Sequence, residues 1–445
     1  MAAPLSHRLA PFEEYMVLDD RPAYPMHIWC RLRLRGQVNR TALETSLRET
    51  LAMHPLLAAR LDRTNPARPQ WRELPAGSAL PLSWSTEPLT EVTTAALDLD
   101  HQAALQVLAS AQGEQVDLVL CAHHAAVDGL GLFGFVSDWL QHYHALIASD
   151  ATSRPAPRDV HRLPGRGEFW FSSLGLLARV PRLLLGLPNT IRFNLHRAAP
   201  LTSALPVQGE AGQSYSPGWL THTLAPEETA ALRQRAKKLG TSLNDLLIRD
   251  LLLTLDRWQR SQGENSQRDW LRISVPVNLR LASEAKLTAA NVVSMVFIDR
   301  RDPLLQQPAP LLASIQQQMN RIKRHRLGLI FPLMLGLLRS LGRLGSMTDD
   351  QRCRATTVLT NLGDPYSQVP LPRDETGHLQ AGDVTLAAIE LIPPLRPFTQ
   401  VAFSIVTYAA KLHIGLHYDR CILTAAQASE LLGAFAATIQ AAEAL

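Results

Sequence analysis

A buried-strand pattern runs directly into two adjacent histidines, and this junction constrains the chain more than any other stretch. Residues 116–122 are almost all aliphatic, as in a strand that is buried on both faces. After His123 and His124, apolar residues from Phe135 onward recur every three or four positions, which predicts an amphipathic helix. The imidazoles therefore lie where a strand ends and a helix begins. Such a position holds a side chain rigidly and lets it face a cavity.

Length and composition narrow the class of protein. At 445 residues the chain is too long for one compact core, so we expect two domains, residues 1–205 and residues 206–445. Both halves mix strand and helix patterns without regular alternation, which favours a layered α/β (α+β) architecture. A net charge of +4 is too small to indicate nucleic-acid binding. The four scattered cysteines, the lack of a secretory signal pattern and the lack of an 18-residue apolar run predict a cytoplasmic protein with free thiols.

Periodicity places the main elements. Alternation over 26–36 predicts a strand with one wet face, and further strand patterns cover 271–277, 292–298, 384–391, 401–408 and 411–418. Helix patterns follow Asn39, Pro226, Ser242 and Thr424, and a long helical region over 313–344 is interrupted by Pro332.

The residues alone leave three interpretations of the group formed by His123, His124 and Asp128. The first is a buried structural cluster, and the second is a metal site with Asp128 as a third ligand. Adjacent histidines rarely chelate one ion, and no supporting cluster of ligands is visible, which disfavours the metal. The third interpretation, acid–base catalysis by one positioned imidazole, is the one that we favour.

A dinucleotide-binding pattern lies immediately behind the histidines. Residues 129–134 match G-x-G-x-x-G, with Asp150 about 20 residues further on. In a true fingerprint the first glycine follows the strand almost directly, whereas here the residues 123–128 intervene. Two of them are bulky imidazoles where a pyrophosphate needs bare backbone, so the spacing disfavours nucleotide binding.

Two apolar segments carry basic residues. One covers 174–187, and the other begins with the basic run 321–326 and extends to Arg343. Each fits a buried helix with a solvated basic edge. Each also fits a surface that contacts a membrane or a lipid-like substrate, so peripheral membrane contact stays open.

With these residues in view, the chain resembles the superfamily of thioester-dependent acyltransferases marked by His-His-x-x-x-Asp-Gly. This superfamily includes chloramphenicol acetyltransferase, nonribosomal condensation domains, wax ester synthases and polyketide-associated acyltransferases. His123, His124, Asp128 and Gly129 match the motif in full. Weaker matches span nearly the whole length, at 9–14, 54–61, 276–280, 291–294 and 360–363. The Asp-Phe-Gly-Trp-Gly motif of plant members is absent, and residues 361–364 stand in roughly its place.

The resemblance implies a fold and a set of roles. Two chloramphenicol-acetyltransferase-like domains would lie in one chain, with the active site in a tunnel between them. His124 would be the general base, His123 would support the turn, and Asp128 would brace the site by pairing with an arginine, for which Arg280 is the candidate. Gly129 would let the helix begin close by. Weaker candidates for substrate contacts come from the later matches: Asn278, Asn291, Ser294, Asn361 and Gly363.

The activity implied is direct transfer of an acyl group from a thioester to a hydroxyl or amine. The donor would be acyl-CoA or a phosphopantetheinyl thioester on an acyl carrier protein, used as a co-substrate, with no permanently bound cofactor and no metal. The acceptor would be lipid-like or a natural product, and the chain would act as a stand-alone enzyme. The alternative is a non-catalytic condensation-domain-like protein that binds carrier proteins.

Overall fold

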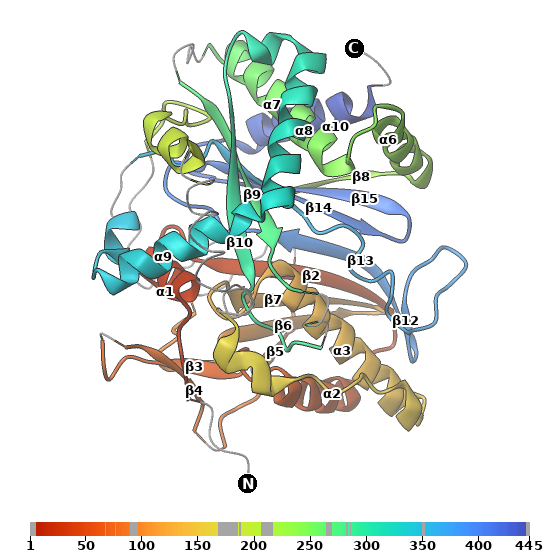
Figure 1. The fold of residues 1–445 in the computed structure, drawn as a ribbon. Coiled ribbons are helices and arrows are strands. Elements are labelled where there is room, and N and C mark those ends of the chain that lie inside the picture. Colours follow the sequence, from red (N-terminus) through yellow and green to blue (C-terminus); the bar gives the residue numbers. More distant parts are fainter. Residues whose placement is uncertain are drawn as a thin grey trace.

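The computed structural model of the chain is shown in Figure 1. The residues that it describes are 6–66, 68–75, 77–89, 97–167, 186, 188–205, 217–263, 269–281, 284, 286–348 and 352–441. Within these residues the strands form two six-stranded sheets and one three-stranded sheet. The predicted mixed α/β fold with two sheet-based parts is confirmed.

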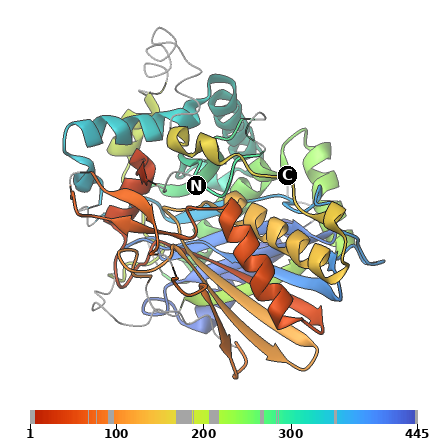
Figure 2. The same ribbon diagram turned by 90° about the horizontal axis from the view of Figure 1, so that it is seen from below.

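The first six-stranded sheet has the order β12-β13-β2-β7-β6-β5. Its strands are β2 (His27–Gly36), β5 (Leu82–Ser85), β6 (Leu105–Gln112), β7 (Gln115–His123), β12 (Gln380–Ala381) and β13 (Val384–Ile392). Helices α2 (Arg40–Met53) and α3 (Gly129–Ile147) lie side by side across one face (Figure 2). β7 is flanked by β2 and β6 and is buried on both faces, which explains its nearly continuous apolar sequence.

The second six-stranded sheet has the order β10-β9-β11-β14-β15-β8. Its strands are β8 (Gly218–Leu224), β9 (Leu271–Asn278), β10 (Val293–Arg300), β11 (Thr357–Asn361), β14 (Val401–Tyr408) and β15 (Lys411–Tyr418). Helices that pack with this sheet into one apolar core are α6 (Pro226–Lys238), α7 (Leu243–Ser261), α8 (Pro308–His325) and α10 (Ala425–Gln440). The predicted hairpin of β14 and β15 is confirmed, with Val401 opposite Tyr418.

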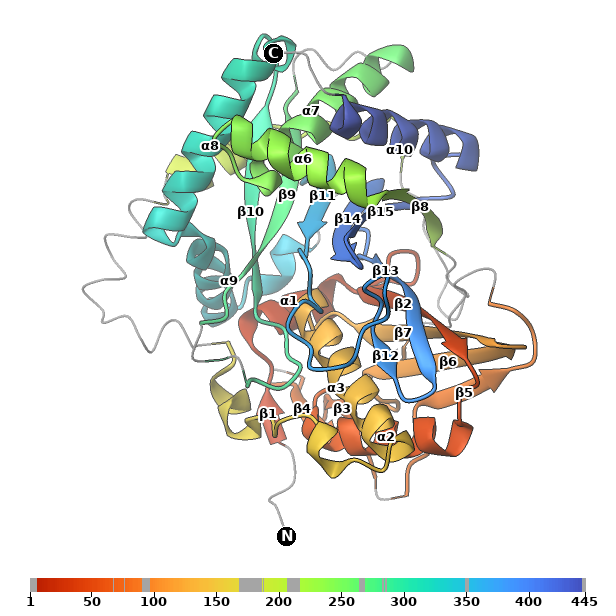
Figure 3. The ribbon, with the colours of Figure 1, turned by 90° about the vertical axis from the view of Figure 1, so that its right-hand side faces the viewer.

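One strand from late in the chain belongs to the first sheet. β13 pairs antiparallel with β2, with Ile389 opposite Leu32, so the two strands lie side by side in Figure 3. β13 also contacts the second sheet, because the Ser404 hydroxyl donates to the Leu391 carbonyl at 2.6 Å. The proposed division at residues 205 and 206 therefore does not separate the two sheets completely, and that boundary stays a prediction.

A smaller sheet and two helices cover the end of the molecule near the N-terminus. The sheet contains β1 (Ser6–Arg8), β3 (Ala59–Asp62) and β4 (Gln70–Glu73), and the helices are α1 (Pro11–Asp19) and α9 (Ile330–Ser340). α9 packs on α1 through an edge-on contact between Phe12 and Phe331, whose ring centroids are 5.7 Å apart. On α9, Arg339 pairs with Glu14 at 2.9 Å, whereas Leu337 is 61% exposed.

The expected interruption of the long helical region is displaced. The chain breaks at Arg326, which adopts a left-handed conformation with φ of 51°, and not at Pro332. Pro332 lies in the first turn of α9, where its missing N–H has no helical partner to lose. The other basic apolar segment, 174–187, lies outside the described residues except for Gly186. None of the described helices is both long and apolar enough to span a membrane.

The position of β13 generates a stability prediction. Ile389 on β13 is fully buried in the core that the first sheet forms with its helices. Ile389→Ala therefore removes packed methyl groups and leaves a cavity. We expect the free energy of unfolding to fall by about 3 kcal/mol. Urea denaturation followed by circular dichroism measures this change. Thr385→Ala, at a half-buried position on the same strand, is the control, and equal losses for the two variants would contradict the core position of β13.

Candidate active site

The backbone turn after β7 determines the orientation of the His124 ring. The His124 N–H donates to the Met26 carbonyl at 2.7 Å, which continues the pairing of β7 with β2. Nδ1 of His124 lies 2.9 Å from the Val127 carbonyl oxygen. A carbonyl only accepts, so Nδ1 carries the ring proton of the neutral imidazole and Nε2 keeps its lone pair. Burial lowers the pKa of His124 from its ordinary value, although the Val127 carbonyl opposes that shift. The neutral form, with a basic Nε2, is thus favoured.

His123 has different surroundings. Its ring is fully buried, and Nδ1 accepts a hydrogen bond from the Ala125 N–H at 3.1 Å. Nε2 therefore carries the proton and faces Asp20, whose carboxylate lies 3.5 Å away. Burial would raise the pKa of Asp20, but the nearby His123 imidazole and the hydrogen bond from the Met26 N–H hold it below its ordinary value. The structure thus places His123 in contacts that stabilise the turn, while the cavity described below is lined by His124.

Asp128 joins two parts of the chain that are far apart in the sequence. Its Oδ1 accepts from the Gly131 N–H at 2.8 Å, so the side chain caps the N-terminus of α3. Its Oδ2 accepts from Nη1 of Arg280 at 2.7 Å and from the Val292 N–H at 2.8 Å. Arg280 Nη2 also donates to the Ala290 carbonyl at 2.8 Å. The ion pair predicted between Asp128 and Arg280 is therefore present.

Two further residues hold this junction together. A Cβ atom on Gly131 would lie 3.0 Å from the Ala290 oxygen and 3.2 Å from Arg280 Nη2, so only glycine lets these groups approach the helix this closely. The sequence had marked Gly131 only as part of the dinucleotide pattern. Asn291 Nδ2 donates to the His124 carbonyl at 2.7 Å, which ties the histidine turn to the segment before β10.

A cavity of about 1300 Å³, measured with the space at its mouths, opens beside His124. It is lined from both six-stranded sheets, since Ile28 comes from β2 and Met295 from β10. The apolar side chains around it are Met16, Met26, Ile28, Leu130, Phe193, Val293, Met295, Phe297, Phe331, Met347, Val358, Leu362 and Leu391. Polar side chains that sequence reasoning did not single out also line it: Tyr15, Asp19, Ser274, Arg354, Thr360, Arg396 and Thr399. Ser274 stands in an ordinary strand pattern that gives no signal of a site, whereas Thr360 begins the matched segment 360–363.

The structure brings only some of the predicted contact residues to this cavity. Asn278 and Asn361 line it, as do Gly129 and Arg280. Asn291 does not line it and instead bonds to the histidine turn. Ser294 is fully buried and donates to the Gly328 carbonyl, away from the cavity. Gly363 forms a turn with φ of 64° beside Asn361, and it also does not line the cavity.

The structure also bears on the two other kinds of site considered for this stretch, a dinucleotide site and a metal site. The G-x-G-x-x-G residues form the first turns of α3, and the Asp128 carboxylate already occupies the N-terminus of that helix. A pyrophosphate would meet that negative charge, which argues against nucleotide binding there. Among the residues that the structure describes, no group of three or more His, Cys, Asp or Glu side chains is arranged to hold a metal ion.

Comparisons with known proteins give matches in structure but not in sequence. No protein-family model matches the chain, and no curated protein matches it by sequence. The first condensation domain of the calcium-dependent antibiotic synthetase, solved with a substrate analogue, is similar with a TM-score of 0.72 at 17% identity. That match covers 99% of this chain and 97% of the other.

Two further solved structures are similar over the whole length. One is polyketide synthase associated protein 5 from Mycobacterium tuberculosis, with a TM-score of 0.65 at 17% identity over 98% of this chain and 99% of that one. The other is the TRI3 trichothecene 15-O-acetyltransferase from Fusarium sporotrichioides, with a TM-score of 0.71 at 12% identity over 99% and 96%. The chain therefore has the two-part α/β fold that is shared by condensation domains and chloramphenicol-acetyltransferase-like acyltransferases.

Proposed function

We propose that this protein is an acyltransferase that moves an acyl group from a thioester to a hydroxyl or amine, with His124 as the general base. The observation that carries the proposal is the direction of the His124 ring. Its Nδ1 proton is engaged by the Val127 carbonyl, which leaves the basic Nε2 for the cavity between the two sheets. Structures of this fold include a trichothecene acetyltransferase, which supports the reaction class.

The chemistry needs one proton acceptor and one protected space. As the acceptor oxygen or nitrogen attacks the thioester carbonyl carbon, its proton moves to Nε2 of His124. The carbon–sulfur bond then breaks, and the proton passes from Nε2 to the departing thiolate. The acyl group ends on the acceptor and a free thiol is released, with no acyl-enzyme formed. The Val127 carbonyl stabilises the imidazolium that exists between these two transfers.

The surroundings of His124 suggest which molecules enter. The apolar lining of the main cavity favours an acyl chain or a lipid-like acceptor. A second, more polar cavity of about 850 Å³ shares Leu130, Asn278 and Arg280 with it and is also lined by Arg158 and Glu284. Its polar groups suit the amide-rich pantetheine arm of acyl-CoA or of an acyl carrier protein. We propose that the donor thioester reaches His124 from this side.

Removal of the base tests the proposal directly. We expect His124→Ala to lower the rate of thiol release by at least about 100-fold, because general-base catalysis typically contributes that much or more. The assay follows free thiol with a chromogenic reagent across a panel of acyl-CoA donors with alcohol and amine acceptors.

His101→Ala is the matched control, since the His101 side chain is 80% exposed and its ion-pair contact is with Asp98, three residues earlier. An unchanged rate in His124→Ala would show that His124 is not the base. Absence of thiol release with every pair in the wild-type protein would instead favour a protein that binds carrier proteins without catalysis.

The pH dependence of the rate follows from the lowered pKa of His124. The base acts only when it is neutral, and burial keeps its pKa below the ordinary value of about 6.5. Activity should therefore be close to its maximum at neutral pH, and the midpoint of its acidic limb should lie below about 6.5. The measurement is kcat/KM against pH with one donor and one acceptor. An acidic limb with a midpoint above 6.5 would contradict this assignment.

If Asp128 and Arg280 form a structural ion pair and not a catalytic pair, their removal should act mainly on the stability of the protein. Removing one partner leaves the other partly buried without its counter-charge, so we expect Asp128→Ala and Arg280→Ala each to lower the free energy of unfolding by about 3 kcal/mol. The double variant should lose less than the sum, by at least about 1 kcal/mol. Urea unfolding of the four proteins gives this coupling.

Arg257→Ala, at an exposed position on α7, is the control for removal of an arginine. Activity should decline in proportion to the folded fraction of each variant. If Asp128→Asn or Arg280→Ala proved stable, well folded and inactive, the residue in question would belong to the chemistry and not to a brace.

A further inference from the structure

A third cavity adjoins the one beside His124 and has a different chemical character at its end. It measures about 750 Å³ and shares four side chains with the main cavity: Phe193, Met295, Phe297 and Phe331. Its remaining lining includes Asn189, Thr190, Arg192, Asp299, Arg300 and Gln318. The two cavities therefore adjoin at apolar side chains, and the third one also carries polar and charged groups, two arginines and one aspartate among them.

Arg300, the last residue of β10, is the buried cation at this end. It is 6% exposed, and its hydrogen-bond partners among the described residues are neutral groups. Nε donates to the Ser314 hydroxyl at 2.9 Å, and Nη1 donates to the Asp299 carbonyl at 2.7 Å and to Gln318 Oε1 at 2.9 Å. Gln318 is held in place because its Nε2 donates to the Phe297 carbonyl at 3.0 Å. Among the described residues, Nη2 of Arg300 has no hydrogen-bond acceptor.

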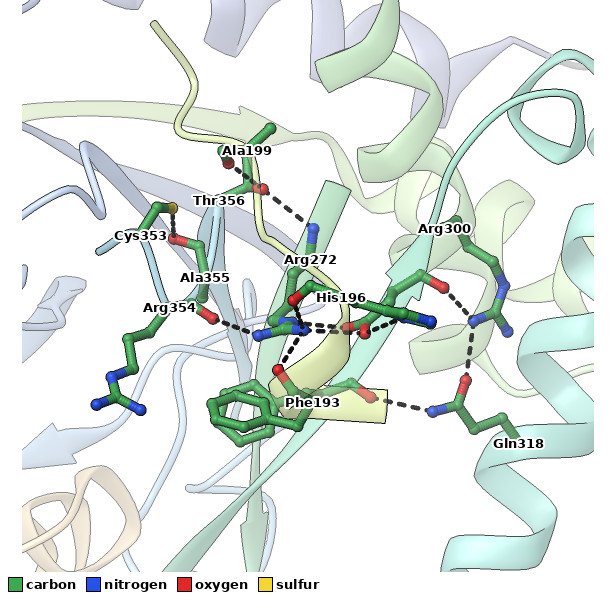
Figure 4. Close-up of polar contacts among 12 residues, drawn as sticks. Phe193, His196, Ala199, Arg272, Arg300, Gln318, Cys353, Arg354, Ala355 and Thr356 are labelled. Atoms are coloured by element: carbon green, nitrogen blue, oxygen red, sulfur yellow. Dashed lines mark hydrogen bonds and ion pairs between the residues drawn. The ribbon is translucent and has the colours of Figure 1, made fainter. Parts of the chain in front are cut away.

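The carboxylate of the preceding residue, Asp299, is already engaged by other groups. Its partners Arg272 and His196 are labelled in Figure 4, together with Arg300. Nε of Arg272 donates to Asp299 Oδ1 at 2.8 Å, and Nη2 donates to Asp299 Oδ2 at 3.1 Å. Nδ1 of His196 lies 3.0 Å from the same Oδ2. The described residues place no carboxylate within ion-pair distance of Arg300. The adjacent sequence positions 299 and 300 therefore carry opposite charges that are not paired with each other.

A buried guanidinium without a counter-ion is unfavourable, and its neighbourhood makes it more so. Burial and the charge of Arg192 lower the pKa of Arg300 to about 10, despite the opposing effect of Asp299. Buried charges are normally paired, so a cation of this kind that lines a cavity indicates that a negatively charged group completes the site when it is filled.

We propose that this third cavity binds the carboxylate of an amphipathic substrate, with Arg300 as the residue that selects it. The apolar body of that molecule lies along the four shared side chains and reaches toward His124. A singly charged group fits best, because three of the donor positions of Arg300 are occupied and only Nη2 is left for it. That this molecule is a reactant rests on the proposed acyl transfer, whereas its binding does not.

Binding to the wild-type protein gives the first test. The probes are decanoate, methyl decanoate and decyl phosphate, which share one chain length and differ in the end group. Isothermal titration calorimetry should show decanoate binding at least about tenfold more tightly than methyl decanoate, as a charge-assisted hydrogen bond allows. Equal affinities would overturn the proposal. Tighter binding of decyl phosphate than of decanoate would overturn the assignment to a carboxylate.

Substitutions of Arg300 test whether this residue causes the preference for decanoate. Arg300→Met should abolish the preference for decanoate, and Arg300→Lys, which keeps the charge, should retain part of it. Arg257→Met, at the exposed position on α7, should leave the preference unchanged. A purely structural role for Arg300 would weaken binding of all three probes equally, and that result would overturn the proposal. If Arg300→Met does not fold, the comparison of probes on the wild-type protein still decides the matter.

The failure of this proposal is distinguishable from the failure of the proposed function. Thiol release that depends on His124, together with no preference for decanoate, would leave the acyltransferase in place and refute the carboxylate site. A preference for decanoate that depends on Arg300, together with no thiol release from any donor and acceptor, would support the carboxylate site and refute the acyltransferase.

Discussion

The candidate active site depends on one carboxylate, that of Asp128. It accepts hydrogen bonds from the first turn of α3, from the backbone before β10 and from Arg280. Gly131 belongs to the helix that follows the histidine turn, and Val292 and Arg280 lie next to strands β10 and β9 of the second sheet. The carboxylate therefore ties the two walls of the cavity together. Its negative charge also suits the N-terminus of α3, where the helix dipole is positive. Gly131 makes this arrangement sterically feasible, because any side chain there would displace Arg280 and the Ala290 carbonyl.

Within that frame, the two adjacent histidines perform different tasks because the backbone offers each a different partner. His124 faces a carbonyl through Nδ1, and His123 accepts an N–H through Nδ1. The resulting tautomers are opposite, so only His124 keeps a basic Nε2 beside the cavity. The two neighbouring histidines thus acquire distinct chemistry. Each is determined by a hydrogen bond to a backbone group only two or three residues further along the chain.

Several of the strands and helices around the site could be predicted from the local pattern of apolar residues. The strand before His123, the helix after Asp128, the alternating β2 and the hairpin of β14 and β15 follow from periodicity, since each is decided by which side chains face a core. The pairing of Asp128 with Arg280 came from the resemblance to a known superfamily and is present as an ion pair. Pro332 misled the prediction, because a proline is tolerated in the first turn of a helix and breaks one only further in. Ser294 and Gly363 were chosen from matched segments, yet neither residue lines the cavity. A short sequence match does not say which way a residue points.

The sequence by itself determined that two imidazoles stand between a buried strand and an amphipathic helix, because periodicity is a local property of the chain. Only the tertiary structure decided that β13 returns to the first sheet, since strand pairing joins residues more than 350 positions apart, such as Ile389 and Leu32. It also decided that Asp299 pairs with Arg272 and that Arg300 has neutral hydrogen-bond partners in the part of the chain that the structure describes. Neighbouring charges in a sequence suggest a pair, but on a strand their side chains point to opposite faces, and the surrounding elements choose their partners.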